Sequence, residues 1–66
     1  MILNKIKQFV DELGITPYEL HKQTGIGKTT AYALYKHSER IPDNDTIARI
    51  CQVYKCKTLD LIEIKD

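Results

Sequence analysis

The sequence lacks the features that mark several large classes of protein. Its 66 residues include no tryptophan and one phenylalanine, and no apolar run approaches the roughly 18 residues of a membrane-spanning helix. Lys7, Asp11 and Glu12 soon interrupt the apolar start, which is not the pattern of a signal peptide. A chain this short buries only about 60% of its unfolded surface, too little for an active site that needs a large scaffold. We therefore expect a single cytoplasmic domain over residues 1–66, with no membrane contact and no enzymatic activity.

Cysteine and histidine are also scarce. Cys51 and Cys56 have no second cysteine pair, and His21 and His37 do not complete a recognisable set of zinc ligands. The sequence justifies no Ser–His–acid or Cys–His arrangement either. We expect both cysteines to be small, reduced core residues. We expect no metal, no cofactor, no small-molecule substrate and no catalytic residue.

Positive charge is concentrated in the middle third of the chain, although the formal net charge is only +1. Residues 21–40 carry four basic side chains against one acidic side chain, a net charge of +3. The flanking segments, residues 1–20 and 41–66, each carry one more acidic than basic side chain. Basic residues on small domains are often only a solvated surface, so their position on the fold decides whether they attract an anionic partner.

Apolar spacing predicts a first helix. Leu3, Ile6, Val10 and Leu13 recur at the spacing of one helix face. Gly14 follows at the place where a left-handed residue ends a helix, a conformation that glycine adopts readily.

A second helix has unusually complete start signals. Thr16 can cap it, Pro17 suits its first position, and Glu19 can reach back to close a capping box. The helix is predicted to run from Pro17 to about Thr24.

Two glycines bound the turn that follows. Gly25 stands where the second helix would stop, Ile26 is a single apolar anchor, and Gly27 can cap a third helix over residues 28–36. The outward side of this third helix is made up of Lys28, Thr29, Tyr32, Ala33 and Lys36, at spacings of three and four.

The rest of the chain is predicted to be mostly helical. Pro42 ends a polar loop, and Asp43 is a good cap for a fourth helix. The apolar face of that helix comprises Ile47, Ile50, Cys51 and Tyr54. Thr58 can cap a short fifth helical turn, and residues 62–64 are either a helix end or a short strand with Glu63 facing out. The predicted fold class is all-α, a compact domain of four or five helices.

Three groups of residues share a common register along the chain. They are Gly14-Ile15-Thr16-Pro17-Tyr18-Glu19-Leu20, then Gly25-Ile26-Gly27-Lys28-Thr29-Thr30, then Leu34, Pro42, Ile47, Ile50 and Leu61. This pattern, from about residue 3 to residue 62, resembles the Cro/cI-type (lambda-repressor-like) helix-turn-helix domain, and its small single-domain members most. The resemblance implies that the second and third helices form a helix-turn-helix. In such a unit the third helix reads base edges in the DNA major groove and the second helix lies across the backbone.

The resemblance also implies a set of DNA contacts. The expected DNA-binding residues are Thr16, Pro17, Gly27, Lys28, Thr29, Thr30, Tyr32, Ala33, Lys36 and Arg40. Lys28 can donate to guanine O6 and N7, and the Thr29 methyl can touch a thymine methyl. Tyr32 is larger than the usual residue and is expected to stack on a sugar or reach a phosphate. Lys36 and Arg40 are expected to contact phosphates, which set the register without reading sequence.

Three positions depart from the family pattern. Pro17 stands where the family often has a glutamine that braces the reading helix, although backbone N–H groups at Thr16-Pro17 can still approach a phosphate. His21 replaces a small residue beside the third helix, so either the packing there is looser or the imidazole points outward. Lys36-His37 replaces an Asn-Gly pair, so the loop after the third helix differs from the family's. These departures affect contact details and not the fold.

Together these features predict a small transcriptional regulator, a repressor, that binds a palindromic operator in double-stranded DNA as a homodimer. The dimer is expected to form through residues 1–3 and 59–64, which alternatively close the domain's own core.

The alternative function is a protein-interaction module, such as an antitoxin or phage-switch component with the same fold. An interaction face of that kind should be apolar, whereas the third helix presents lysine, threonine and tyrosine. Tyr18 either meets DNA or shields the second helix, and Tyr35 is expected to cover the core.

Overall fold

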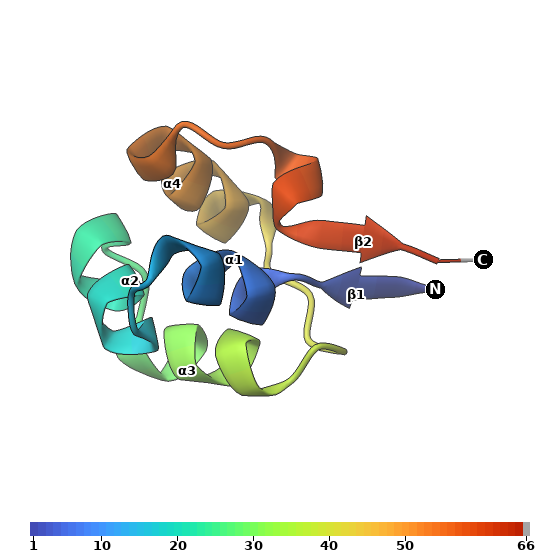
Figure 1. Cartoon of the computed structure of the whole chain (residues 1–66), viewed down its shortest axis with the longest axis horizontal. Helices are drawn as coiled ribbons and strands as arrows, with labels where there is room; N and C mark the ends of the chain where they lie inside the picture. Colours follow the sequence, from blue (N-terminus) through green and yellow to red (C-terminus); the bar gives the residue numbers. More distant parts are fainter. Residues whose placement is uncertain (66) are drawn as a thin grey trace.

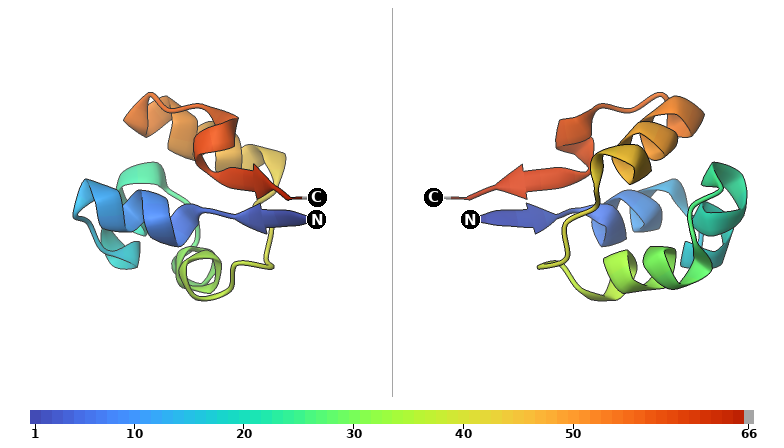
Figure 2. Two further views of the ribbon diagram at one scale, coloured as in Figure 1. Left: turned by 45° about the vertical axis from the view of Figure 1, so that its right-hand side comes forward. Right: turned by 180° about the vertical axis from the view of Figure 1, so that it is seen from behind.

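A central helix organises the fold. In the computed structural model, which describes residues 1–65, helix α1 (Ile6–Leu13) lies between α3 (Lys28–Lys36) and α4 (Asn44–Tyr54) (Figure 1). Helix α2 (Pro17–Thr24) closes one end of the molecule, and a two-stranded sheet lies at the other end (Figure 2). The sheet consists of β1 (Ile2–Asn4) and β2 (Ile62–Ile64), and the 3-10 turn η1 (Thr58–Asp60) precedes β2. The predicted all-α class is confirmed, with this small sheet as an addition.

The core lies where the four helices meet. Its buried apolar side chains are Ile6, Val10, Leu20, Ile26, Ala31, Leu34, Ile50 and Leu61. Burial of a leucine or isoleucine side chain stabilises the folded state by about 1.5–3 kcal/mol before chain entropy is subtracted. Phe9 and Tyr54 pack edge to face against this core, with ring centroids 5.7 Å apart. The predicted apolar face of the fourth helix therefore does face the core.

Local signals define most helix ends as predicted. Gly14 and Gly25 end α1 and α2 in the left-handed conformation, with φ of 72° and 78°. Thr16 Oγ1 accepts a hydrogen bond from the Glu19 N–H, and Glu19 Oε1 accepts one from the Thr16 N–H, both at 3.1 Å. The Asp43 carboxylate caps α4 by accepting a hydrogen bond from a backbone N–H of the first turn, which lowers the pKa of Asp43. These contacts satisfy backbone groups that a helix end leaves without partners.

The N-terminal segment corrects the predicted first helix. Leu3 belongs to β1, and α1 begins only at Ile6. Strand β1 pairs antiparallel with β2, with Ile2 opposite Ile64. The spacing of Leu3 fits a helix, but a strand partner at the other end of the chain leaves no trace in a local pattern. The same pairing shows that residues 62–64 are a strand.

The segment before β2 also differs from the prediction in detail. Thr58 is the first residue of η1 and not its cap. The Asp60 carboxylate instead reaches back to accept a hydrogen bond from the Lys57 N–H at 2.9 Å. Leu61 then enters the core, while Glu63 is exposed, as predicted for a strand with that residue facing out.

The two cysteines lie half-buried beside the core. Cys51 and Cys56 are free thiols whose Sγ atoms are 3.6 Å apart. Within residues 1–65, no three histidine, cysteine or acidic side chains gather as a candidate metal site.

None of the helices in residues 1–65 is long and apolar enough to cross a lipid bilayer.

Candidate nucleic-acid interface

Polar contacts hold the turn between α2 and α3. Thr24 Oγ1 donates to the Leu20 carbonyl at 2.6 Å and accepts from the Ile26 N–H at 3.4 Å. His21 Nδ1 lies 2.6 Å from the Ile26 carbonyl oxygen, so the ring N–H donates to the middle of the turn. This contact braces the turn. The Pro17 side chain has no polar group with which to make such a brace. The half-buried imidazole is therefore directed at the turn backbone, which answers the packing question raised by its size.

Helix α3 lies along an outer face of the molecule, and no other element within residues 1–65 covers its outer side in any of the three views (Figures 1 and 2). Ala31 and Leu34 are buried on its inner side. Of the predicted contact residues, Gly27, Lys28, Thr29, Thr30, Lys36 and Arg40 are exposed, and Tyr32 and Ala33 are half-buried. The fold thus brings the predicted residues of α3 onto one accessible helix, with Gly27 before it and Arg40 in the loop after it.

The start of α2 is less suited to a phosphate than the sequence indicated. The Thr16 N–H already donates to the Glu19 carboxylate, and Pro17 has no N–H. The negative charge of Glu19 therefore occupies the position expected for an anion. A phosphate could approach these two residues only by displacing that carboxylate.

Tyr18, whose role the sequence left open, forms a basic-aromatic cluster with Lys22 and Lys28. Tyr18 is 43% exposed on α2, and the Lys22 Nζ and the Lys28 Nζ lie 5.9 Å and 5.6 Å from its ring centroid. The His21 ring meets it edge-on at 5.8 Å between centroids. Lys22 lies one turn after Tyr18 on α2, whereas Lys28 opens α3. Tyr18 thus joins the basic side chains of both helices.

A second polar group fixes α3 to α1. Asp11 accepts a hydrogen bond from the Tyr35 hydroxyl at 2.7 Å and one from Lys7 Nζ at 2.8 Å. Lys7 Nζ also lies 5.2 Å from the centroid of the Tyr35 ring. The hydrogen bonds from Lys7 and Tyr35 hold the pKa of the Asp11 carboxyl below its usual value, and the same bonds raise the pKa of both partners. The Tyr35 ring packs against the core, as predicted, while its hydroxyl ties the two helices together.

The loop after α3 is held by one buried amide. Asn4 Nδ2 donates to the carbonyl oxygens of His37 at 2.8 Å and Arg40 at 2.6 Å. Its Oδ1 accepts from the Ile6 N–H at 3.0 Å, and its own N–H donates to the Ser38 carbonyl at 2.8 Å. These contacts fix the backbone that carries Arg40. No sequence signal pointed to Asn4, because its partners lie more than thirty residues away.

Comparison with known families and structures agrees with this geometry. A family model described as the Cro/C1-type HTH DNA-binding domain matches residues 5–66. The chain belongs to this Cro/C1-type helix-turn-helix family. No curated protein is significantly similar to it in sequence. Among solved structures, the Cro/C1-type domain is similar to the crystal structure of "a putative DNA-binding protein from Bacteroides fragilis", with a TM-score of 0.78 and 24% identity. The match covers 96% of this chain and 100% of the other, and it supports the fold.

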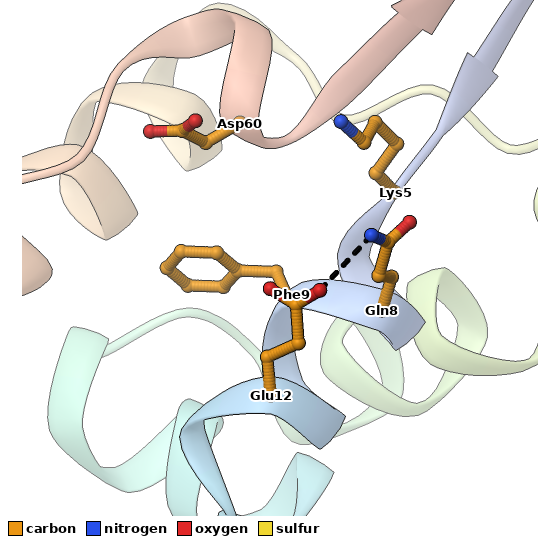
Figure 3. A pocket seen from close by; sticks show the side chains of 5 residues that line it. All are labelled: Lys5, Gln8, Phe9, Glu12 and Asp60. Carbon is orange, nitrogen blue, oxygen red and sulfur yellow. Dashed lines mark hydrogen bonds between the residues drawn. The ribbon is translucent and has the colours of Figure 1, made fainter.

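The Cro/C1-type domain also has a shallow pocket of about 180 Å³ between α1 and η1. Figure 3 shows its lining residues, Lys5, Gln8, Phe9, Glu12 and Asp60. Gln8 Nε2 donates to the Glu12 carboxylate at 3.0 Å, so two polar groups of the lining are already hydrogen-bonded to each other. No residue of α2 or α3 lines this pocket, and its mixed charges do not match an anionic ligand. The pocket is therefore separate from the helix-turn-helix.

Proposed function

We propose that this domain is a sequence-specific transcriptional regulator, a repressor, that inserts α3 into the major groove of an operator. The observation that carries the proposal is the exposed polar and basic side of α3, presented by a complete and well-braced helix-turn-helix. In such units the second helix of the pair carries the side chains that reach base edges. Thr29, Thr30 and the half-buried Tyr32 and Ala33 are the proposed base-proximal residues.

The basic residues complete the proposed interface. Lys36, in the last turn of α3, and Arg40, in the following loop, are exposed and supply charge for phosphates. The Asn4 contacts support a fixed position for the backbone at Arg40. Gly27 and Lys28 lie at the start of α3, where the helix would enter the groove. Thr16 and Pro17 contribute less in this proposal, because the Glu19 carboxylate already occupies the Thr16 N–H.

A palindromic operator and a homodimer are part of the same proposal. Ile2 and Ile64 are directly paired in the sheet yet are 48% and 65% exposed. Among residues 1–65 no third strand pairs with this sheet, so an edge is available to a second copy. The sheet lies at one end of the 33 Å long axis. Two copies that pair antiparallel there would extend in opposite directions from the shared sheet, as two half-sites of a palindrome require.

Selection of bound sequences from a random duplex pool at about 150 mM salt tests the function. Salt at this concentration weakens the sequence-independent attraction to phosphates, so specific binding must persist without it. We expect a palindromic motif. Thr29→Ala should change the preference at one position of each half-site, whereas Gln52→Ala, an exposed change on α4, should leave the motif unchanged. Recovery of no motif would contradict operator reading and favour a protein-interaction module.

A further inference from the structure

The basic-aromatic cluster of Tyr18, Lys22 and Lys28 is drawn together at the boundary between α2 and α3. Two ammonium groups lie within 6 Å of the centroid of one exposed ring, at 5.9 Å and 5.6 Å. The negative face of an aromatic ring attracts cations at such distances. The ring therefore holds near it two lysine ammonium groups that would otherwise move freely in solvent.

Within the part of the chain that the structure describes, the cluster has no ion-pair partner of its own. Among residues 1–65, the ion pairs are Lys7 with Asp11, His37 with Glu39, and Arg49 with Asp45. Lys22 and Lys28 are in none of them, and the Glu19 carboxylate accepts a hydrogen bond from the Thr16 N–H. The neighbouring His21 uses Nδ1 for the Ile26 carbonyl. An external anion would relieve the repulsion between the two ammonium groups.

The position of the Lys28 ammonium bears on what it recognises. It lies over a residue of α2, the helix that crosses the DNA backbone in helix-turn-helix complexes. A side chain that reads a guanine must instead extend along the floor of the groove to O6 and N7. With its ammonium at Tyr18, Lys28 extends towards α2, the side on which this docking geometry places the sugar-phosphate backbone.

We propose that Tyr18, Lys22 and Lys28 form a phosphate clamp, in which Tyr18 is a positioning residue and Lys28 binds the backbone instead of reading a base. This inference rests on the proposed DNA-binding function and replaces the base contact that the sequence predicted for Lys28. Sequence reading then belongs to the residues further along α3, from Thr29 onward. The required feature of Tyr18 is its ring and not its hydroxyl.

The test measures binding of the full chain to the selected operator and to an unrelated duplex over a series of salt concentrations. Lys28→Ala and Lys22→Ala should each weaken binding to both duplexes and lower the salt slope by about 0.9, the value for one lost phosphate contact. Neither should change the selected motif. Lys28→Arg should retain binding, because a guanidinium keeps the charge and also stacks on aromatic rings.

The role of the ring is tested by a matched pair. Tyr18→Leu should weaken binding to both duplexes, whereas Tyr18→Phe should bind like the unaltered chain. Circular dichroism of both variants checks that the fold is kept, and Thr29→Ala checks that the assay detects loss of base reading.

Relaxed preference at one motif position in Lys28→Ala, with unchanged binding to the unrelated duplex, would overturn the clamp. So would unaltered binding by Tyr18→Leu. Failure of the unaltered chain to bind any duplex would instead overturn the proposed function.

Discussion

At the scale of single residues, Asn4 shows how one buried amide joins distant parts of a small domain. The residue is 6% exposed, and its side chain makes three hydrogen bonds, two of them to carbonyl groups of the loop after α3. An amide suits this place because it offers a donor to the carbonyls and an acceptor to the Ile6 N–H. The residue thereby connects the start of α1 to the backbone beside the proposed DNA-binding face.

Replacing Asn4 should lower the unfolding free energy by more than the size of its side chain suggests. Asn4→Leu leaves the His37 and Arg40 carbonyls and the Ile6 N–H without these partners, and we expect a loss of about 2 kcal/mol in unfolding free energy. For a domain this small, that loss corresponds to a melting temperature lower by roughly 10 °C. Gln8→Leu, the same change at an exposed amide, is the control and should leave the melting temperature nearly unaltered. Equal thermal unfolding of the two variants would show that the Asn4 bonds contribute little.

Cys56 should be an unreactive thiol. Burial, with a smaller effect from the neighbouring Cys51, raises the pKa of Cys56 to about 11. Because the thiolate is the reactive form and an ordinary thiol has a pKa of about 8.5, alkylation by iodoacetamide at pH 8 should be roughly a hundredfold slower than in the unfolded chain. Peptide mapping by mass spectrometry identifies the modified cysteine. Modification of Cys56 at the same rate with and without urea would contradict this prediction.

At the scale of elements, local chemistry explains which parts of the fold could be predicted. The bounds of α2 and the start of α3 follow from Thr16, Glu19, Gly25 and Gly27, all of which act within a few residues of their own position. Strand β1 could not be found in this way, since its partner is at the other end of the chain. The exposed side of α3 was likewise predictable from spacing. The position of the Lys28 ammonium was not, because it depends on a tyrosine ten residues earlier.

The two left-handed glycines allow the turn between α2 and α3 to be tested separately from a simple helix end. Gly14→Ala places a Cβ in open space, so only the left-handed backbone opposes it, at a cost of about 1–2 kcal/mol. A Cβ at Gly25 lies 3.3 Å from Arg49 Nη1 as well, so Gly25→Ala should destabilise by at least as much. Urea denaturation measures both. A smaller loss for Gly25→Ala would show that Arg49 moves aside without cost and that the turn relaxes.

The contact between α1 and α3 should depend on pH. The pKa of Asp11 is lowered in the folded state by the hydrogen bond from Lys7 and then by that from Tyr35. Its stabilising effect is therefore complete above the ordinary pKa of about 3.9 and is lost as the pH falls through the lower folded value. Asp11→Asn should melt below the unaltered chain at neutral pH, and the gap should close in acid. Tyr35→Phe removes one donor and should remove part of the gap. A gap independent of pH would exclude the carboxylate charge as its cause.

At the scale of the whole molecule, the two ends of the domain carry different surface features. Helix α2 and the start of α3 lie at one end, where Tyr18 gathers positive charge, while the sheet with its exposed isoleucines lies at the other (Figure 1). Helix α3 runs along a third side that neither end covers. A second copy joined at the sheet would therefore leave both α3 helices free. This separation supports a palindromic site read by two copies.

The proposed dimer makes a direct prediction for sedimentation velocity. Ile64→Lys places a charge in the exposed isoleucine pair, so association should weaken because burying an unpaired charge is unfavourable. The control is Val53→Lys on α4, where a 42% exposed valine lies outside the sheet. We expect the unaltered chain and the Val53 variant to form dimers as concentration rises, and the Ile64 variant to remain a monomer. On DNA, the Ile64 variant should bind a single half-site normally and lose its preference for the full palindrome, because each α3 is unchanged. Dimers of the Ile64 variant at the same concentration as the unaltered chain would place the interface elsewhere on the domain.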